Sequence, residues 1–385
     1  MTVLRTTVVD VDLDAIAANT RAIRARAGVD VIAVLKADAY GHGAEAVAEA
    51  AIDAGAAVLA VATVEEAIVL RRARPHDALL VLLGAQQPAE RDAAIALDLA
   101  LTVWDVDSAR LIGEAARAAG KTARVHFKTD TGLTRLGAPL VEAADRYRAI
   151  AKLPGVAVDG VFTHLARADE TDLATTTEQL DRFDSLLDAI DPPRWVHTSA
   201  TAGVASLETR RRITAVRPGL ALYGLHAAPH LASRLPLRPA LSWRSRVHRV
   251  ADVPRGTGVS YGHEYRLPRD GRIATVPVGY GDGLARAATG ARLLVGGAAV
   301  PIAGRVAMDH VMLDVSGLGE VRAGDEVVVI GAQGGLSATA DDLARAAGTI
   351  NYEVVTAIMP RVPRRYLRGG TVVATKTLAD GYARC

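Results

Sequence analysis

Short hydrophobic runs alternate with longer amphipathic segments from about residue 30 to residue 217. Eight of the runs have the length of buried strands, and the segments between them have the spacing of helices. The predicted strands are 31–35, 58–63, 78–83, 99–103, 124–128, 158–163, 195–198 and 213–217. Eight buried strands separated by helices predict an α/β fold, a parallel (β/α)8 TIM-type barrel. A doubly wound open sheet is the alternative, because strand runs alone do not show closure.

The pattern changes after residue 240, where strands follow one another through glycine-rich turns. The predicted strands there are 241–253, 273–278, 292–295, 298–302, 311–315 and 326–330, followed by helices at 340–347, with Thr339 as the cap, and 352–359. This succession predicts a mostly antiparallel β domain. The alternating run 3–13 is expected to join it. We therefore predict a barrel domain at 12–238 and a β-rich domain at 1–11 and 239–385, and no structure is predicted for the tail beyond Tyr366.

Polar residues stand at or just beyond the ends of the predicted barrel strands. They are Lys36, Lys128, Asp130, His164, Ser199 and Arg217. Four of them also have an ordinary structural explanation: Lys36 as a surface lysine, His164 as a structural histidine, Asp130 as a turn cap and Ser199 as a helix cap. Because barrel enzymes place their chemistry at the carboxyl ends of the strands, six polar residues on one rim predict an active site.

The loops after the seventh and eighth strands have the character of a phosphate site. Ser199 precedes a predicted helix, whose first backbone N–H groups attract anions, and Gly219 lets the backbone approach a ligand closely. The chain has no G-x-x-x-x-G-K-[ST] loop, and the glycines at 279–283 do not follow the dinucleotide fingerprint. It also lacks an H-E-x-x-H motif, and its histidines are scattered, so we predict no catalytic metal.

Composition limits the remaining classes of function. The chain has 385 residues, enough for two domains, and a net charge of only +2, which predicts no nucleic-acid partner and no membrane partner. No apolar run reaches the ~18 residues of a membrane span, and the N-terminus lacks the form of a signal peptide. Cys385 is the only cysteine. A chain without a disulfide framework or a thiolate metal site is expected in a reducing cytoplasm.

The segment 33–43, AVLKADAYGHG, resembles the pyridoxal-phosphate lysine signature of bacterial alanine racemases. Lys36 matches the lysine that forms a Schiff base with the cofactor, and Tyr40 matches a phosphate ligand. The resemblance covers essentially the whole chain, because further blocks match at 126–137, 162–166, 217–224, 259–262, 304–309 and 351–354. It implies a pyridoxal 5'-phosphate enzyme that racemises alanine and supplies D-alanine for peptidoglycan.

The resemblance also implies a role for each matched residue. The implied catalytic residues are Lys36, Tyr261, His164 and Arg217, with Arg217 bonded to the pyridine nitrogen of the cofactor. The implied phosphate ligands are Tyr40, Ser199, Gly219, Leu220 and Tyr352. Arg135 would hold the substrate carboxylate and the phenolic oxygen of the cofactor, facing a carbamylated Lys128. Met308 and Asp309 would line the substrate pocket from the other subunit, and Tyr261 would also come from it. The implied assembly is a homodimer with shared active sites.

Racemisation needs a proton removed from one face of Cα and returned to the other. By resemblance, Lys36 serves the D-enantiomer and Tyr261 the L-enantiomer. A free tyrosine has a pKa of about 10, so neighbouring positive charge, reached through His164 and Arg217, is expected to lower it.

Three positions depart from the family pattern. Thr198 replaces an asparagine, Ala307 a cysteine and Thr134 a glycine, and none of them is needed for proton transfer. A racemase of serine or another small amino acid remains an alternative. A decarboxylase of basic amino acids on the same architecture would carry a glutamate instead of Arg217. A non-catalytic carrier of pyridoxal phosphate would lack the second domain.

Overall fold

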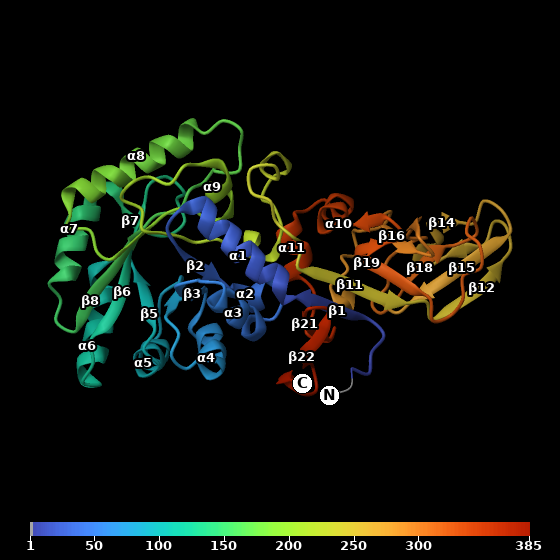
Figure 1. The fold of residues 1–385 in the computed structure, drawn as a ribbon, viewed down its shortest axis with the longest axis horizontal. Helices are drawn as coiled ribbons and strands as arrows, with labels where there is room; N and C mark the ends of the chain where they lie inside the picture. The colour runs from blue at the N-terminus through green and yellow to red at the C-terminus, as the bar shows by residue number, and fades with distance from the viewer. Residues whose placement is uncertain (1–2) are drawn as a thin grey trace. The chain divides into compact units, whose positions relative to one another are not determined.

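The computed structural model describes residues 3–385, and the chain forms two compact units (Figure 1). The barrel unit consists of Ala15–Ala39 and Val47–Pro239. The β-rich unit consists of the chain up to Asp14, the short segment Tyr40–Ala46, and Ala240–Cys385. Among the residues described, no helix is both long enough and apolar enough to cross a membrane.

The eight predicted strands of the barrel unit are confirmed, and they close into a circle. They are β2 (Asp30–Val34), β3 (Val58–Val61), β4 (Leu79–Val81), β5 (Ala100–Val103), β6 (Ala123–Asp130), β8 (Val156–Phe162), β9 (Trp195–His197) and β10 (Ala215–Val216). All pairings around the circle are parallel, and β10 pairs with β2 to complete it. Every residue of β3, β4 and β5 is buried, as expected for parallel strands covered on both faces. The open-sheet alternative is therefore wrong.

Helices follow the strands where the hydrophobic pattern predicts them. They are α1 (Leu13–Ala27), α3 (Ala44–Asp53), α4 (Val64–Ala73), α5 (Pro88–Ala96), α6 (Val106–Ala118), α7 (Leu140–Ala151), α8 (Ala174–Ala189) and α9 (Thr201–Ser206). Local caps fix several starts. Thr63 and Glu66 form a reciprocal capping box at α4, and the Asp105 side chain caps α6. A two-residue strand that was not predicted, β7 (Ala138–Pro139), pairs with the end of β6.

The β-rich unit is built around β1 (Val8–Asp12), which joins it as predicted. The strand pairs antiparallel with β11 (Leu241–Arg246) and parallel with β21 (Arg364–Arg368). The same sheet contains β16 (Arg292–Val295), β17 (Ala298–Pro301), β19 (Glu326–Gln333), β20 (Leu336–Ala338), β22 (Thr371–Thr377) and β23 (Gly381–Arg384). A second sheet contains β12 (Arg249–Val253), β15 (Gly271–Val276) and β18 (Val311–Asp314), and β13 (Gly258–Val259) pairs with β14 (Tyr265–Arg266). The helices are α10 (Ala340–Ala347), capped by Thr339, and α11 (Asn351–Thr356).

One prediction for this unit was wrong. The single strand predicted at 241–253 is two strands, because the chain changes sheets at Val247 and His248, whose N–H groups donate to Asp325 O and Thr275 O. The tail beyond Tyr366, for which no structure was predicted, forms β22 and β23. Gly369 and Gly370, both with positive φ, make the turn into β22, whose β-branched residues suit a strand.

The segment around Tyr40 is held in the β-rich unit by close backbone packing. A Cβ on Gly41 would lie 2.2 Å from Val355 O, and a Cβ on Gly43 would lie 1.8 Å from the hydroxyl of Tyr366. The buried Arg364 guanidinium donates to Gly41 O through Nη2 at 3.1 Å. These glycines are therefore required by packing as well as by their positive φ.

Candidate functional site

Lys36 begins a left-handed turn that directly follows strand β2. The turn is α2 (Lys36–Tyr40), in which Ala37, Asp38, Ala39 and Tyr40 all have φ between 52° and 55°. This conformation costs about 1–2 kcal/mol for each residue other than glycine, so the rest of the structure must enforce it. The Glu66 carboxylate supplies part of that support. It accepts hydrogen bonds from the backbone N–H groups of Ala37 at 2.6 Å, Ala62 at 2.7 Å and Thr63 at 3.2 Å.

The half-buried Lys36 amine is influenced by one cation and one anion. Burial lowers its pKa, the charge of Arg135 lowers it further, and Glu66 opposes both effects. A lysine with a lowered pKa is more often neutral near pH 7, and only the neutral amine acts as a nucleophile or base.

Arg217 is the best-connected polar side chain at the carboxyl end of the barrel. It is 4% exposed, and its Nη2 donates to Thr163 O and Thr198 O, both at 2.8 Å. Nη2 also contacts His164 Nδ1 at 3.2 Å, and Nη1 contacts His197 Nδ1 at 2.8 Å. Burial, with a further contribution from Arg135, lowers the pKa of Arg217 to about 9, so that the guanidinium is still charged at pH 7.

The contacts of Arg217 determine the tautomers of three histidines. A guanidinium only donates, so Nδ1 of His164 and of His197 must accept, and each neutral ring carries its proton on Nε2. His197 Nε2 then donates to His126 Nδ1 at 2.8 Å. Burial first, and then the charge of Arg217, lowers the pKa of His164 and of His126 to about 3. His197, which stacks on Phe162 at 4.6 Å, has its pKa lowered by the same causes. All three rings are therefore neutral at pH 7.

Lys128 lies at the end of β6, beside this network. Its side chain is 5% exposed, and its Nζ is 5.6 Å from the centre of the Phe162 ring. Burial lowers the pKa of Lys128 to about 8, the charges of Arg217 and Arg135 contribute, and Asp130 opposes them.

Arg135 and Asp130 lie at the two ends of the loop that follows β6. The Asp130 carboxylate accepts from the backbone N–H groups of Gly132 and Leu133, both at 2.8 Å, so its capping role is the one expected from sequence. The exposed Arg135 acts electrostatically on Lys36, Lys128, His164 and Arg217. The predicted rim residues therefore converge on one region of the barrel.

The loops after β9 and β10 are tied together around Ser199. The Arg217 N–H donates to Ser199 O at 2.7 Å, and the Ala221 N–H donates to the Thr201 hydroxyl at 3.0 Å. Ser199 is not the helix cap considered above, because Ala200 occupies that position and makes no side-chain cap. Gly219 and Leu220 begin the short helix η1 (Leu220–Tyr223) beside this loop. The predicted phosphate residues of the barrel unit are therefore neighbours.

Three cations of this region have no carboxylate partner among the described residues. Across residues 3–385, neither Lys128, Arg135 nor Arg217 forms an ion pair with a carboxylate. Burying cations without counter-ions is costly, so the arrangement favours an anionic ligand. A ligand with a phosphate and a phenolic oxygen, bound with an amino-acid carboxylate, matches this demand.

Two further site candidates meet in the β-rich unit. The rings of Tyr40 and Tyr352 lie 6.2 Å apart between centroids, with an angle of 47° between their planes. Burial raises the pKa of the Tyr40 phenol, and Tyr352 adds to the effect, so Tyr40 is a neutral hydrogen-bond donor at pH 7.

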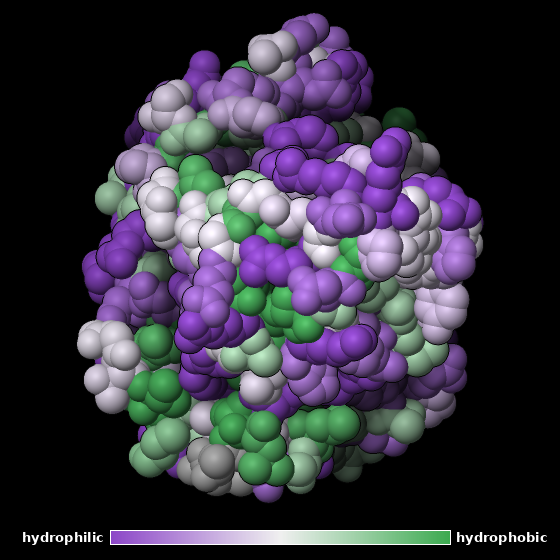
Figure 2. Space-filling model, turned by 90° about the vertical axis from the view of Figure 1, so that its right-hand side faces the viewer, coloured by the Kyte–Doolittle hydropathy of each residue, from purple (hydrophilic) through white to green (hydrophobic). Residues whose placement is uncertain are grey.

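Tyr261 lies on an exposed turn, η3 (Tyr261–His263), of the same unit. Its side chain is 70% exposed, and its neighbours Ser260 and His263 both have positive φ. The Ser260 hydroxyl donates to Arg305 O at 2.7 Å, which ties the turn to the segment that contains Met308, itself 52% exposed. Figure 2 shows the face at the β12 and β15 end of this unit, where hydrophobic side chains gather among hydrophilic ones.

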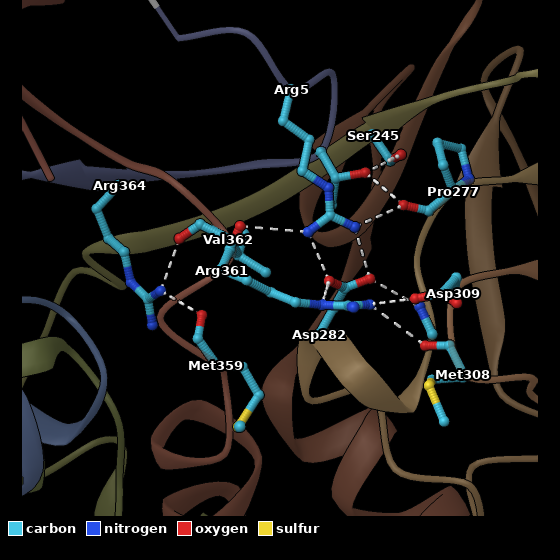
Figure 3. A network of polar contacts seen from close by, with 12 residues as sticks. Arg5, Ser245, Pro277, Asp282, Met308, Asp309, Met359, Arg361, Val362 and Arg364 are labelled. Atoms are coloured by element: carbon cyan, nitrogen blue, oxygen red, sulfur yellow. Dashed lines mark hydrogen bonds and ion pairs between the residues drawn. The ribbon is translucent and has the colours of Figure 1, made fainter. Parts of the chain in front are cut away.

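Met308 and Asp309 are connected to an ion-pair network, centred on the buried Asp282, that sequence reasoning missed (Figure 3). Arg361 Nη2 donates to Asp309 Oδ1 at 2.7 Å, and Arg361 Nε donates to Asp282 Oδ1 at 2.7 Å.

Three residues of the barrel unit were also missed by sequence reasoning: His126, His197 and Glu66. His126 lies two residues before Lys128, and His197 lies two residues before Ser199. Side chains two apart in a strand share a face, so this spacing was the signal that could have revealed the two histidines.

Comparisons with known proteins agree with this geometry. Residues 11–227 match the family model described as alanine racemase, N-terminal domain, and residues 240–366 match the one described as alanine racemase, C-terminal domain. The chain is 39% identical to alanine racemase 2 of Caldanaerobacter subterraneus, over 97% of this chain and 98% of the relative. It is 42% identical to alanine racemase of Symbiobacterium thermophilum, over 94% and 97%. The crystal structure of alanine racemase from Bacillus anthracis with bound L-Ala-P has a TM-score of 0.90 and 37% identity, covering 99% of this chain and 100% of that one.

Proposed function

Because this chain belongs to the alanine racemase family, we propose that it interconverts L-alanine and D-alanine with pyridoxal 5'-phosphate as cofactor and with Lys36 and Tyr261 as its two bases. The family makes it an isomerase of the racemase class. The observation that most supports the proposed site is the convergence of Lys36, Lys128, Arg135 and Arg217 at the carboxyl end of the barrel. Within the described part of the chain, the last three form no ion pair with a carboxylate.

In this proposal the residues implied by the resemblance hold the cofactor. Lys36 would bind it covalently, and Arg217 would donate to its pyridine nitrogen. The phosphate ligands would be Ser199, Gly219, Leu220, Tyr40 and Tyr352, and Arg135 would hold the substrate carboxylate. When bound, pyridoxal phosphate supplies the electron sink that makes the α-proton of the amino acid acidic.

The network around Arg217 supports its assignment to the pyridine nitrogen. A charged guanidinium at that nitrogen disfavours protonation of the ring, whereas a carboxylate would favour it. Its four contacts with Thr163, His164, Thr198 and His197 fix its orientation before any ligand binds. This argues against the decarboxylase alternative, which places a glutamate there.

The two bases would act on opposite faces of Cα. Lys36 is suited to the task because its lowered pKa increases the fraction of neutral amine. Tyr261 needs a stabilised phenolate. Neutral His164, with its proton on Nε2 and its Nδ1 on Arg217, can donate a hydrogen bond to such an oxygen. We propose that neutral His164, rather than a charged imidazole, donates a hydrogen bond to the Tyr261 oxygen.

The proposal includes a homodimer in which Tyr261, Met308 and Asp309 complete the active site of the partner. The exposure of two of these residues supports the homodimer. Tyr261 is 70% and Met308 52% exposed in the single chain, which is unusual for groups that must bind a substrate away from water. The proposal also includes a carbamylated Lys128 opposite Arg135, and a role in supplying D-alanine for peptidoglycan from the cytoplasm.

The test is a chirality assay. The purified protein is incubated with pyridoxal phosphate and with each single enantiomer of alanine or serine, and the product is separated on a chiral column. Conversion of either alanine enantiomer to the racemate is expected. Faster turnover of serine than of alanine would support the alternative of a serine racemase. Binding of the cofactor without any racemisation would indicate a non-catalytic carrier.

A further inference from the structure

Four charged side chains of the β-rich unit form a continuous chain in Figure 3. Arg5 binds both oxygens of Asp282, with Nη1 to Oδ1 at 2.5 Å and Nη2 to Oδ2 at 2.8 Å. Arg361 reaches the same carboxylate through Nε at 2.7 Å and extends to Asp309 through Nη2, also at 2.7 Å. Two guanidinium groups and two carboxylates make the cluster neutral overall.

Asp282 is the buried centre of the cluster. It is 0% exposed, and its second oxygen also accepts from the Gly279 N–H at 3.0 Å. Burial acts to raise the pKa of Asp282, but the hydrogen bonds from Arg5, Arg361 and Gly279 outweigh it and hold the pKa below its ordinary value. The carboxylate is therefore charged at pH 7, and it holds both guanidinium groups in place.

The same turn also binds the Met308 segment through its backbone. The Tyr280 N–H donates to Ala307 O at 3.0 Å, and the Gly281 N–H donates to Met308 O at 2.8 Å. A Cβ on Gly279 would lie 2.3 Å from Ala307 O, so the two segments approach too closely for a larger residue. The turn η4 (Tyr280–Asp282) and the segment that carries Met308 and Asp309 therefore form one rigid piece.

We propose that Asp282 and Arg361 are positioning residues for the substrate pocket, because they fix the place and direction of Met308 and Asp309. The inference rests on the proposed function, in which Met308 and Asp309 line that pocket. Neither Asp282 nor Arg361 needs to touch the substrate. Their role is to keep the wall of the pocket at a fixed distance from the amino acid, so they determine substrate affinity and discrimination between small side chains.

Arg361 cannot be replaced by lysine in this role. Its Nε and Nη2 face two different carboxylates at the same time, and a lysine amine is a single point of charge. The Arg361→Lys variant keeps the charge but cannot reach both Asp282 and Asp309 in this geometry, so Asp309 is released.

A matched control lies in the same unit. Arg365 donates through Nε and Nη2 to the two oxygens of Asp10, at 2.6 and 2.9 Å, and its side chain is 37% exposed, against 33% for Arg361. Arg365→Lys therefore disturbs a comparable ion pair, and among residues 3–385 Arg365 makes no hydrogen bond or ion pair with Met308 or Asp309.

The experiment measures steady-state racemisation of alanine and of serine by the cofactor-loaded wild type, Arg361→Lys and Arg365→Lys. We expect KM for alanine to rise about tenfold in Arg361→Lys with kcat changed less than about threefold, and the preference between alanine and serine to shift. Arg365→Lys is expected to change neither. Equal KM values in the two variants would overturn the inference.

A double-mutant cycle tests whether Arg361 acts through Asp309. With Asp309→Asn already in place, Arg361→Lys is expected to raise KM by less than about twofold more, because the interaction is already lost. Independent, multiplicative effects would overturn the positioning role. Absence of racemisation by the wild type would instead contradict the proposed function, so the two failures are distinguishable. Asp282→Asn, which leaves the size of the side chain unchanged, should reproduce the KM effect of Arg361→Lys.

Discussion

Lys128 is expected to react with carbon dioxide far more readily than an ordinary lysine. Its pKa is lowered from 10.5 to about 8, chiefly by burial and then by Arg217 and Arg135. At pH 7 about a tenth of such amines are neutral, compared with about 3 in 10,000 at a pKa of 10.5, a gain of about 300-fold. The neutral amine adds to CO2 and releases one proton, and the resulting carbamate is an anion between two cations.

The sign of the pH dependence follows from the same pKa. The neutral fraction of Lys128 rises as the pH increases through about 8, so at constant dissolved CO2 the carbamate occupancy should increase from pH 6 to pH 9. Racemase activity should rise with occupancy if the carbamate orients Arg135 toward the substrate. Removing CO2 at pH 7 should lower the activity, and restoring it should recover the loss.

The assay is 13C NMR of the protein equilibrated with 13C-labelled bicarbonate. One carbamate resonance is expected in the wild type and in Lys152→Met, a control at an exposed lysine, and none in Lys128→Met. The reasoning is refuted if the wild type shows no carbamate at pH 8, or if the resonance persists in Lys128→Met.

Two further predictions concern groups that position the site. Glu66→Gln should weaken pyridoxal-phosphate binding about tenfold or more, because hydrogen bonds to a charged acceptor contribute about 1.5–3 kcal/mol and this carboxylate accepts from three backbone N–H groups. A fluorescence titration of the cofactor measures the affinity, and Glu65→Gln, at an exposed position, is the control. Equal affinities of the two variants would contradict the prediction. His197→Phe should lower kcat about 100-fold, because it leaves Arg217 Nη1 without its acceptor. His197→Asn retains an acceptor, so its kcat should fall less. Equal kcat values in the two variants would show that the hydrogen bond is unimportant.

The strands of the barrel were predictable because burial on both faces leaves a nearly continuous apolar run, as in Val58–Val61. The left-handed turn after Lys36 was not, because Ala37, Asp38 and Ala39 have no intrinsic preference for positive φ. The turn is held in part by the carboxylate of Glu66, which lies 29 residues from Ala37 in the sequence.

In the candidate site, too, the features that depend on distant contacts could not be predicted from the sequence. The resemblance implied a role for Met308 and Asp309 but none for Arg361 and Asp282, which lie 52 and 27 residues from Asp309 and come close to it through folding. The change of sheets at Val247 was likewise hidden, since the hydrophobic alternation continues through it while its N–H partner, Asp325 O, comes from a distant part of the chain. Long-range polar contacts therefore account for much of what the sequence pattern did not reveal.

The most direct test of the two-base proposal is the exchange of the α-proton of alanine in D2O, followed by 1H NMR. In cofactor-loaded Tyr261→Phe, exchange from D-alanine should continue through Lys36, while exchange from L-alanine should fall by at least about 100-fold. Equal exchange rates for the two enantiomers in that variant, at the wild-type level, would contradict the assignment of Lys36 and Tyr261 to opposite faces.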